Sequence, residues 1–182
     1  MKEERVSTLL AEDHAEVDVL FRKLLQALEA GDARPAFGLL DLLWARLAVH
    51  IRAENLALFP AILRAAEQAS DGQNAAPRLD ETRSAISELR VDHDFFMREL
   101  AGAVNRMRAH TSEQFPPEQL AAIRQIVEAV RVRLELHNRL EEEKVYRWPA
   151  LLLNAEENAR LVKDARREIE NLPPRFDMPS DE

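Results

Sequence analysis

The sequence predicts an all-α protein, an antiparallel up-and-down four-helix bundle with an extra C-terminal helix. Two observations predict this fold class. The chain of 182 residues holds only four glycines, and the strong helix formers Ala, Leu, Glu and Arg dominate it. Its apolar residues also recur at helical spacing over long stretches that short breaks separate. Long helices joined by short loops form bundles of this kind.

Breaks in the apolar pattern give the expected elements in order. Gly31 ends the first helix, and Pro35 lies in the first turn of the second. The small, polar stretch 69–77 is the clearest internal loop, and Pro149 is expected to end the fourth helix. Helices are therefore expected at about 4–30, 35–68, 79–110, 117–147 and 155–171.

These elements divide the chain into two parts. Residues 1–150 are expected to form the four-helix bundle, and residues 151–182 a C-terminal helix followed by a flexible acidic tail. Leftover apolar residues at Trp44, Ile51 and Ile62 would permit a homodimer.

Each long stretch carries one histidine within its apolar seam. In the first, Leu10 and Val17 flank His14 at steps of four and three residues, which are core-facing positions. The seam histidines are His14, His50, His93 and His137. Glutamates at positions 54 and 141 follow the second and fourth of these histidines by one helical turn.

The pattern occurs twice along the chain. Asp-His at positions 13–14 recurs at 92–93, and His50-x3-Glu54 recurs as His137-x3-Glu141. The sequence therefore predicts two helix hairpins, each giving a His from its first helix and a His-x3-Glu pair from its second.

Two buried carboxylates need compensation. A carboxylate in an apolar seam is costly unless it is paired, and no Lys or Arg shares the seam with Glu54 or Glu141. Cations at the centre of the bundle would supply the missing charge, because His and Glu one turn apart lie on one helix face. Imidazole and carboxylate donors suit iron or manganese, and the chain has no cysteine. The candidate metal ligands are His14, His50, Glu54, His93, His137 and Glu141.

This residue set resembles the hemerythrin-like HHE cation-binding domain family over roughly residues 5–150, including the pair Phe59-Pro60. The resemblance implies a four-helix bundle around a non-haem di-iron centre. It assigns His14 and His50 to one iron and His93 and His137 to the other. Glu54 and Glu141 would bridge two iron ions, Fe2+ or Fe3+, together with an oxo or hydroxo group. Manganese or zinc are the alternatives.

One departure from the oxygen-carrying members bears on function. Those proteins have a fifth histidine four residues after the third seam histidine, where this chain has Met97, and their second motif ends in Asp instead of Glu141. The resemblance is therefore nearer to members associated with iron or oxygen sensing, nitrosative stress or redox reactions.

Three functions are compatible with this pattern. The leading hypothesis is a di-iron protein that binds O2 or a related small molecule for sensing, storage or oxidative and nitrosative stress response. The second is a redox enzyme that reduces peroxide or NO, or acts as an oxidase. The third is an iron-handling or interaction module whose folding depends on metal. The sequence leaves open whether the protein is an enzyme.

Composition excludes other classes. The formal net charge is −8 with no dense basic patch, which argues against nucleic acid or anionic lipid as partners. The charged start MKEERVST has no apolar segment behind it, and no stretch is long enough to span a membrane. A cytoplasmic protein with a gaseous or peroxide ligand, and with no identified protein partner, is expected.

Other polar residues receive simpler interpretations. Tyr146, the only tyrosine, is expected to pack with its hydroxyl in water, a hydrogen bond to the site being the alternative. Asp13 and Asp92 are expected on a charged, exposed face, the alternative being that they orient a neighbouring loop or helix. Asp18, one turn after His14, is expected at the surface, an extra metal ligand being the alternative. Glu142 is expected to be solvated, or else to support a metal ligand, and His110 to lie on the surface.

Overall fold

The computed structural model describes residues 5–69, 76–110 and 115–176. Within these ranges every regular element is helical, and none is a β-strand. The expected all-α class is therefore confirmed. The expected loop at 69–77 and the expected acidic tail lie mostly outside the described residues. The elements are α1 (Val6–Ala30), α2 (Ala33–Ala53), the π-helix η1 (Glu54–Leu58), α3 (Phe59–Gln68), α4 (Leu79–Ala109), α5 (Pro117–Glu143), the 3-10 helix η2 (Val145–Arg147), α6 (Trp148–Leu152), α7 (Ala155–Ile169) and the 3-10 helix η3 (Pro174–Phe176).

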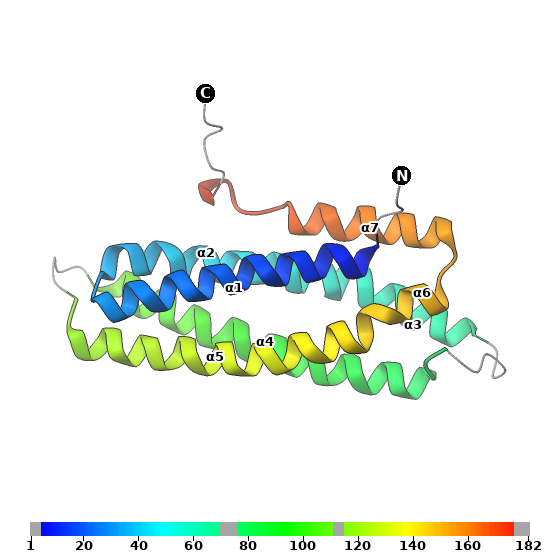
Figure 1. Ribbon diagram of the computed structural model, residues 1–182, viewed down its shortest axis with the longest axis horizontal. Helices are drawn as coiled ribbons and strands as arrows, with labels where there is room; N and C mark the ends of the chain where they lie inside the picture. The colour runs from blue at the N-terminus through cyan, green and yellow to red at the C-terminus, as the bar shows by residue number, and fades with distance from the viewer. Residues whose placement is uncertain (1–4, 70–75, 111–114, 177–182) are drawn as a thin grey trace, which may run out of the picture.

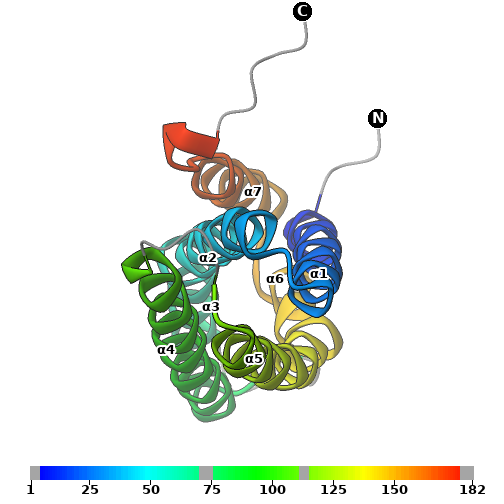
Figure 2. The ribbon, with the colours of Figure 1, turned by 90° about the vertical axis from the view of Figure 1, so that its left-hand side faces the viewer.

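Four long helices lie side by side along the longest axis of the molecule (Figure 1). Helix α1 packs against α2 and α5, and α4 packs against the same two helices. Viewed from the end, α1, α2, α4 and α5 surround a common centre, and α7 lies outside them against α1 and α2 (Figure 2). The centre of the bundle is where side chains from all four helices meet.

A left-handed glycine connects the first two helices. Gly31 has φ 78 and follows the last residue of α1. Its N–H donates to the Leu28 carbonyl, and that of Asp32 donates to the Ala27 carbonyl, at 3.3 and 3.0 Å. Glycine adopts this conformation without a Cβ penalty, which lets α2 begin within a few residues.

The second long helix is not continuous, contrary to the expectation for 35–68. A π-helical segment, η1, separates α2 from α3. Pro60 lies in the first turn of α3, and its missing N–H cannot complete an α-helical ladder. One wide turn accommodates the proline, and Glu54 is the first residue of that turn. Such π turns often occur at functional sites.

The fourth helix ends earlier than expected. It stops at Glu143, where Lys144 leaves helical geometry with φ −127 and ψ −69. The turn η2 and the short helix α6 follow. Pro149 does not end the fourth helix, because it lies in the first turn of α6, where no backbone N–H is needed. This break redirects Tyr146, with consequences described below.

The predicted seams form the core. Apolar residues from all four long helices are buried in one cluster toward the α1–α2 turn, and a second cluster occupies the other end of the bundle. The predicted seam positions are all buried: Leu10, Val17, Phe21, Leu24, Leu28, Leu40, Leu43, Leu47, Ile86, Leu89, Phe96, Leu100, Ile123, Val127, Val130 and Leu134.

Helix α7 covers part of the bundle. It packs on α2 and η1 and buries Leu161 and Ile169, and Glu168 accepts a hydrogen bond from Arg52 at 2.6 Å. Ile51 and Ile62 were expected to lie on leftover apolar faces, but both are buried, whereas Trp44 is half-buried. The homodimer stays a prediction. Among the described residues, no helix has the length and apolar character required to cross a bilayer.

Candidate metal centre

The four seam histidines meet in two pairs inside the bundle. The Nε2 atoms of His14 (α1) and His50 (α2) are 3.1 Å apart. Those of His93 (α4) and His137 (α5) are 3.2 Å apart. All four side chains are buried. The structure therefore brings together the pairs that the family resemblance assigns to one iron each.

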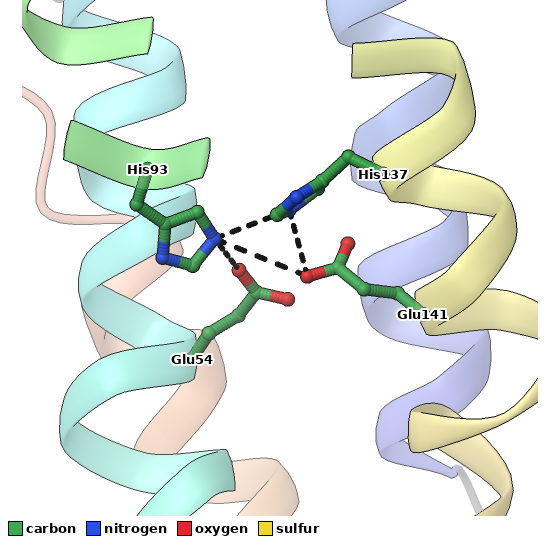
Figure 3. Close-up of side chains that lie close together, drawn as sticks. All are labelled: Glu54, His93, His137 and Glu141. Atoms are coloured by element: carbon green, nitrogen blue, oxygen red, sulfur yellow. Dashed lines mark hydrogen bonds and ion pairs between the residues drawn. The ribbon is translucent and has the colours of Figure 1, made fainter. Parts of the chain in front are cut away.

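Two glutamates span the two histidine pairs. Glu54 places Oε1 at 3.7 Å from His50 Nε2 and Oε2 at 3.1 Å from His93 Nε2. Glu141 places Oε2 at 3.3 Å from His14 Nε2 and Oε1 at 3.0 Å from His137 Nε2. Each carboxylate thus directs one oxygen to each pair, which is the arrangement a bridging ligand requires. Figure 3 shows the His93 side of this arrangement, with His93, His137, Glu54 and Glu141 facing a common point.

The donor set fits cations. Glu54 and Glu141 are 0% exposed. Glu54 Oε2 and Glu141 Oε1 nevertheless accept no hydrogen bond from any residue that the structure describes. Donor atoms of Glu54, His93, His137 and Glu141 lie within 4.8 Å of one another, and so do those of His14, His50 and Glu141. Buried carboxylate oxygens without hydrogen-bond donors, surrounded by imidazole nitrogens, are compensated when a metal binds.

Aspartates hold two of the histidines from outside. Asp13 Oδ2 lies 2.7 Å from His50 Nδ1, and Asp92 Oδ2 lies 3.1 Å from His137 Nδ1. The expectation of an exposed charged face is wrong for both residues, because Asp13 is buried and Asp92 half-buried. An aspartate that accepts from Nδ1–H leaves Nε2 free to bind a metal.

Arginines complete these contacts at matched positions. Arg46 pairs with Asp13, and Arg133 Nη2 lies 2.6 Å from Asp92 Oδ1. Each arginine precedes its histidine by four residues. The repeated motif is therefore Arg-x3-His-x3-Glu, one turn longer than the predicted His-x3-Glu, and its spacing is visible in the sequence.

The other two histidines have different outer partners. His14 Nδ1 lies 2.7 Å from Glu142 Oε1, so Glu142 contacts a candidate ligand and is not a purely solvated side chain. Asn55 Nδ2 donates to His93 Nδ1 at 3.3 Å. Glu142 and Asn55 each follow the glutamate of their own motif by one residue.

Tyr146 lies inside the site, so the expectation of a hydroxyl in water is wrong. Its Oη donates to Glu54 Oε1 at 2.6 Å and lies 3.1 Å from Glu141 Oε2. It is also 3.1 Å from His14 Nε2 and 3.4 Å from His50 Nε2. The break in helical geometry before η2 carries the ring inward.

Carboxylates make the histidines basic. Burial opposes protonation of His50, but the charge of Glu54 and the hydrogen bond with Asp13 outweigh it and raise its pKa to about 10. Burial likewise opposes protonation of His14 and His137, and neighbouring carboxylates raise the pKa of both. Metal binding must therefore displace protons from the site at neutral pH.

The acidic groups are shifted in opposite directions. Burial works against ionisation of Glu54, yet the charge of His50 outweighs it and holds the Glu54 pKa well below its usual value. Burial raises the pKa of Tyr146 well above its usual value, and the charges of Glu141 and Glu54 add to the effect. Tyr146 is thus a neutral hydrogen-bond donor beside two glutamates.

Two further candidates lie away from the site. His110 follows the last residue of α4, and its ring is 4.6 Å from that of Phe115. Asp18, one turn after His14, is exposed. The structure brings neither residue to the glutamates.

A helical bundle with buried histidines and glutamates around one centre defines a cation-binding protein. The chain belongs to the hemerythrin family: the model of the hemerythrin HHE cation binding domain matches residues 5–149. Searches of curated proteins and of solved structures found no match. Helix α7 lies beyond the matched residues.

Proposed function

We propose that this protein binds two iron ions through His14, His50, Glu54, His93, His137 and Glu141, and uses them to bind O2 or a related small molecule in sensing, storage or stress response. The proposal includes the up-and-down antiparallel bundle over residues 1–150, the C-terminal addition at 151–182 and a cytoplasmic location. The observation that carries it is the pair of spanning carboxylates. Glu54 and Glu141 each direct one oxygen to each histidine pair.

The donor set supports iron over softer metals. It contains imidazole and carboxylate but no thiolate. Two bound iron ions would supply reversible two-electron redox chemistry. The two glutamates would offset only part of the charge of these ions, which leaves a net positive charge that favours an added anion.

The chain's own residues prepare the site. Asp13 and Asp92 accept from Nδ1–H of their histidines and so direct Nε2 inward. Apolar side chains one helical turn from the seam histidines are buried and would limit the entry of water: Leu10, Val17, Leu47, Phe96 and Leu134. A dry site strengthens electrostatic interactions with a bound anion.

One observation favours the redox-enzyme alternative. Tyr146 holds a proton within hydrogen-bond distance of Glu54 and Glu141. A buried hydroxyl can supply a proton during reduction of peroxide or NO. This alternative ranks second because the sequence shows no dedicated substrate pocket and no general acid beyond Tyr146.

A reaction test separates the two functions. Full-length protein is loaded with iron, reduced without air, and mixed separately with O2, NO and H2O2. A small-molecule binder gives a stable spectral change that reverses when the ligand is removed. Continuous consumption of H2O2 or NO, when an excess of an added reductant is present to return electrons to the centre, supports the enzyme. Absence of a spectral response to all three ligands would contradict the proposal.

A further inference from the structure

The two halves of the cage are related residue by residue. Asp13 contacts His50 as Asp92 contacts His137, and each aspartate pairs with an arginine four residues before that histidine. These contacts place the same kinds of charged group in both halves, although Arg46 also pairs with Glu16. Clearer differences lie at other matched residues.

The residue after each glutamate is one such difference. Glu142 follows Glu141 and contacts His14 Nδ1, whereas Asn55 follows Glu54 and contacts His93 Nδ1. A carboxylate that accepts from Nδ1–H makes Nε2 a stronger electron donor to a metal, and a neutral amide does so less. This contact favours metal binding at the His14/His50 position.

Arg90 also holds the Asn55 amide in the orientation that is less favourable for metal binding by His93. Arg90 Nε donates to Asn55 Oδ1 at 3.1 Å, which leaves the Asn55 NH2 group directed at His93 Nδ1. An NH2 group can only donate, so Asn55 gives His93 Nδ1 no acceptor of the kind that the Glu142 carboxylate gives His14 Nδ1. Arg90 and Asn55 therefore weaken the His93 side.

The aromatic residues at matched positions, Phe59 and Tyr146, also differ between the two halves. Phe59 and Tyr146 each follow the glutamate of their motif by five residues. Phe59 stacks on His93 with ring centroids 6.0 Å apart, and Tyr146 stacks on His14 at 5.5 Å. The hydroxyl that only Tyr146 carries lies beside His14 and His50. A neutral hydroxyl therefore lies beside the His14/His50 position, whereas the matched residue beside His93, Phe59, carries none.

We propose that the cage is asymmetric: the His14/His50 position binds its metal tightly, the His93/His137 position exchanges its metal readily, and Glu142 and Asn55 set the difference. This inference rests on the proposed binding of two metal ions. It makes Glu142 and Asn55 positioning residues that act through His14 and His93.

Iron release tests the asymmetry directly. Full-length protein is loaded anaerobically with two equivalents of Fe2+ and mixed with excess chromogenic iron(II) chelator, and absorbance is followed with time. Two phases of one iron each are expected. The isosteric variant Glu142→Gln should accelerate the slow phase about tenfold and leave the fast phase unchanged. Asn55→Asp should slow the fast phase alone.

Two controls separate positioning from a general structural effect. Glu143→Gln alters an exposed neighbour and should leave both phases unchanged. Glu142→Asp retains the charge, so its slow phase of iron release should have a rate close to that of the wild type.

The outcomes are distinct. Release of two irons in a single phase, or a slow phase unaffected by Glu142→Gln, would overturn the asymmetry and leave the proposed function intact. Failure of the wild-type chain to retain two irons would overturn both.

Discussion

Tyr146 brings a hydroxyl to two glutamates that share a buried site. Its Oη donates to Glu54 Oε1 at an oxygen–oxygen distance of 2.6 Å, and burial raises the pKa of the hydroxyl. The hydroxyl is therefore protonated near neutral pH and acts as a hydrogen-bond donor.

The substitution Tyr146→Phe should destabilise the metal-free protein. Glu54 and Glu141 would lose a buried donor, and a buried group without its hydrogen bond costs about 1–3 kcal/mol. Urea unfolding in the presence of a chelator measures the change. Iron binding should persist, because Tyr146 is outside the proposed ligand set. Unchanged stability in the metal-free form would show that the hydroxyl does not serve the carboxylates.

The histidines predict a pH dependence for the metal-free protein. The pKa of His50 is raised to about 10 from an ordinary value of 6.5, so the folded state binds more protons than the unfolded state between these values. The stabilisation is complete below pH 6.5 and is lost as pH rises through about 10. Urea unfolding from pH 6 to pH 10 should show falling stability. Rising stability over this range would contradict the charge assignment.

Metal affinity should depend on pH in the opposite direction. The pKa values of His14, His50 and His137 are raised, so protons on these histidines compete with the metal. Metal affinity therefore weakens as pH falls, and binding at neutral pH releases protons. Calorimetric titration with Fe2+ in two buffers of different ionisation enthalpy measures this release. The variant His110→Ala should release the same number, since His110 lies outside the site.

At the scale of the element, two interruptions of helical geometry shape the site. The π turn η1 begins at Glu54, and the break at Lys144 precedes the turn that carries Tyr146. Apolar periodicity predicts where helices run, but it is insensitive to one extra residue in a turn or to a short 3-10 segment. The positions of Pro60 and Pro149 mark both regions, yet their effect depends on how the chain packs around them.

Helix α7 should contribute stability through its buried face. Leu161 is 4% exposed, and truncating a buried leucine costs about 2–5 kcal/mol. Leu161→Ala should therefore lower the free energy of unfolding by about this amount. Leu151 is 46% exposed, so Leu151→Ala is the matched control and should change it by less than about 0.5 kcal/mol. Equal effects of the two substitutions would show that α7 is not docked as described.

At the scale of the whole molecule, the sequence predicts the helical class, the buried seams and the residues that meet at the centre. His14, His50, His93 and His137 are recognisable because each interrupts an apolar seam at core spacing. The outer contacts were harder to predict. Asp13 and Asp92 lie next to seam histidines in sequence but bond to histidines on the neighbouring helix, and this depends on how helices are rotated against each other.

The internal repeat connects these scales. A cage built from two matched hairpins would be symmetric if its surroundings were symmetric. Glu142 in one half occupies the place that Asn55 occupies in the other, and Tyr146 occupies the place of Phe59. In the asymmetry that we propose, these few positions make the two metal positions differ without any change in the six candidate ligands.

Metal content per chain is the most direct test of the central claim. Full-length protein and its Glu54→Ala and Glu141→Ala variants are loaded with iron, desalted and measured by mass spectrometry for metal, with His110→Ala as the control. Two irons per chain are expected in the wild type and in the control, and one or none in each glutamate variant. A full complement of two irons in either glutamate variant, or fewer than two in the wild type, would contradict a dinuclear site bridged by Glu54 and Glu141.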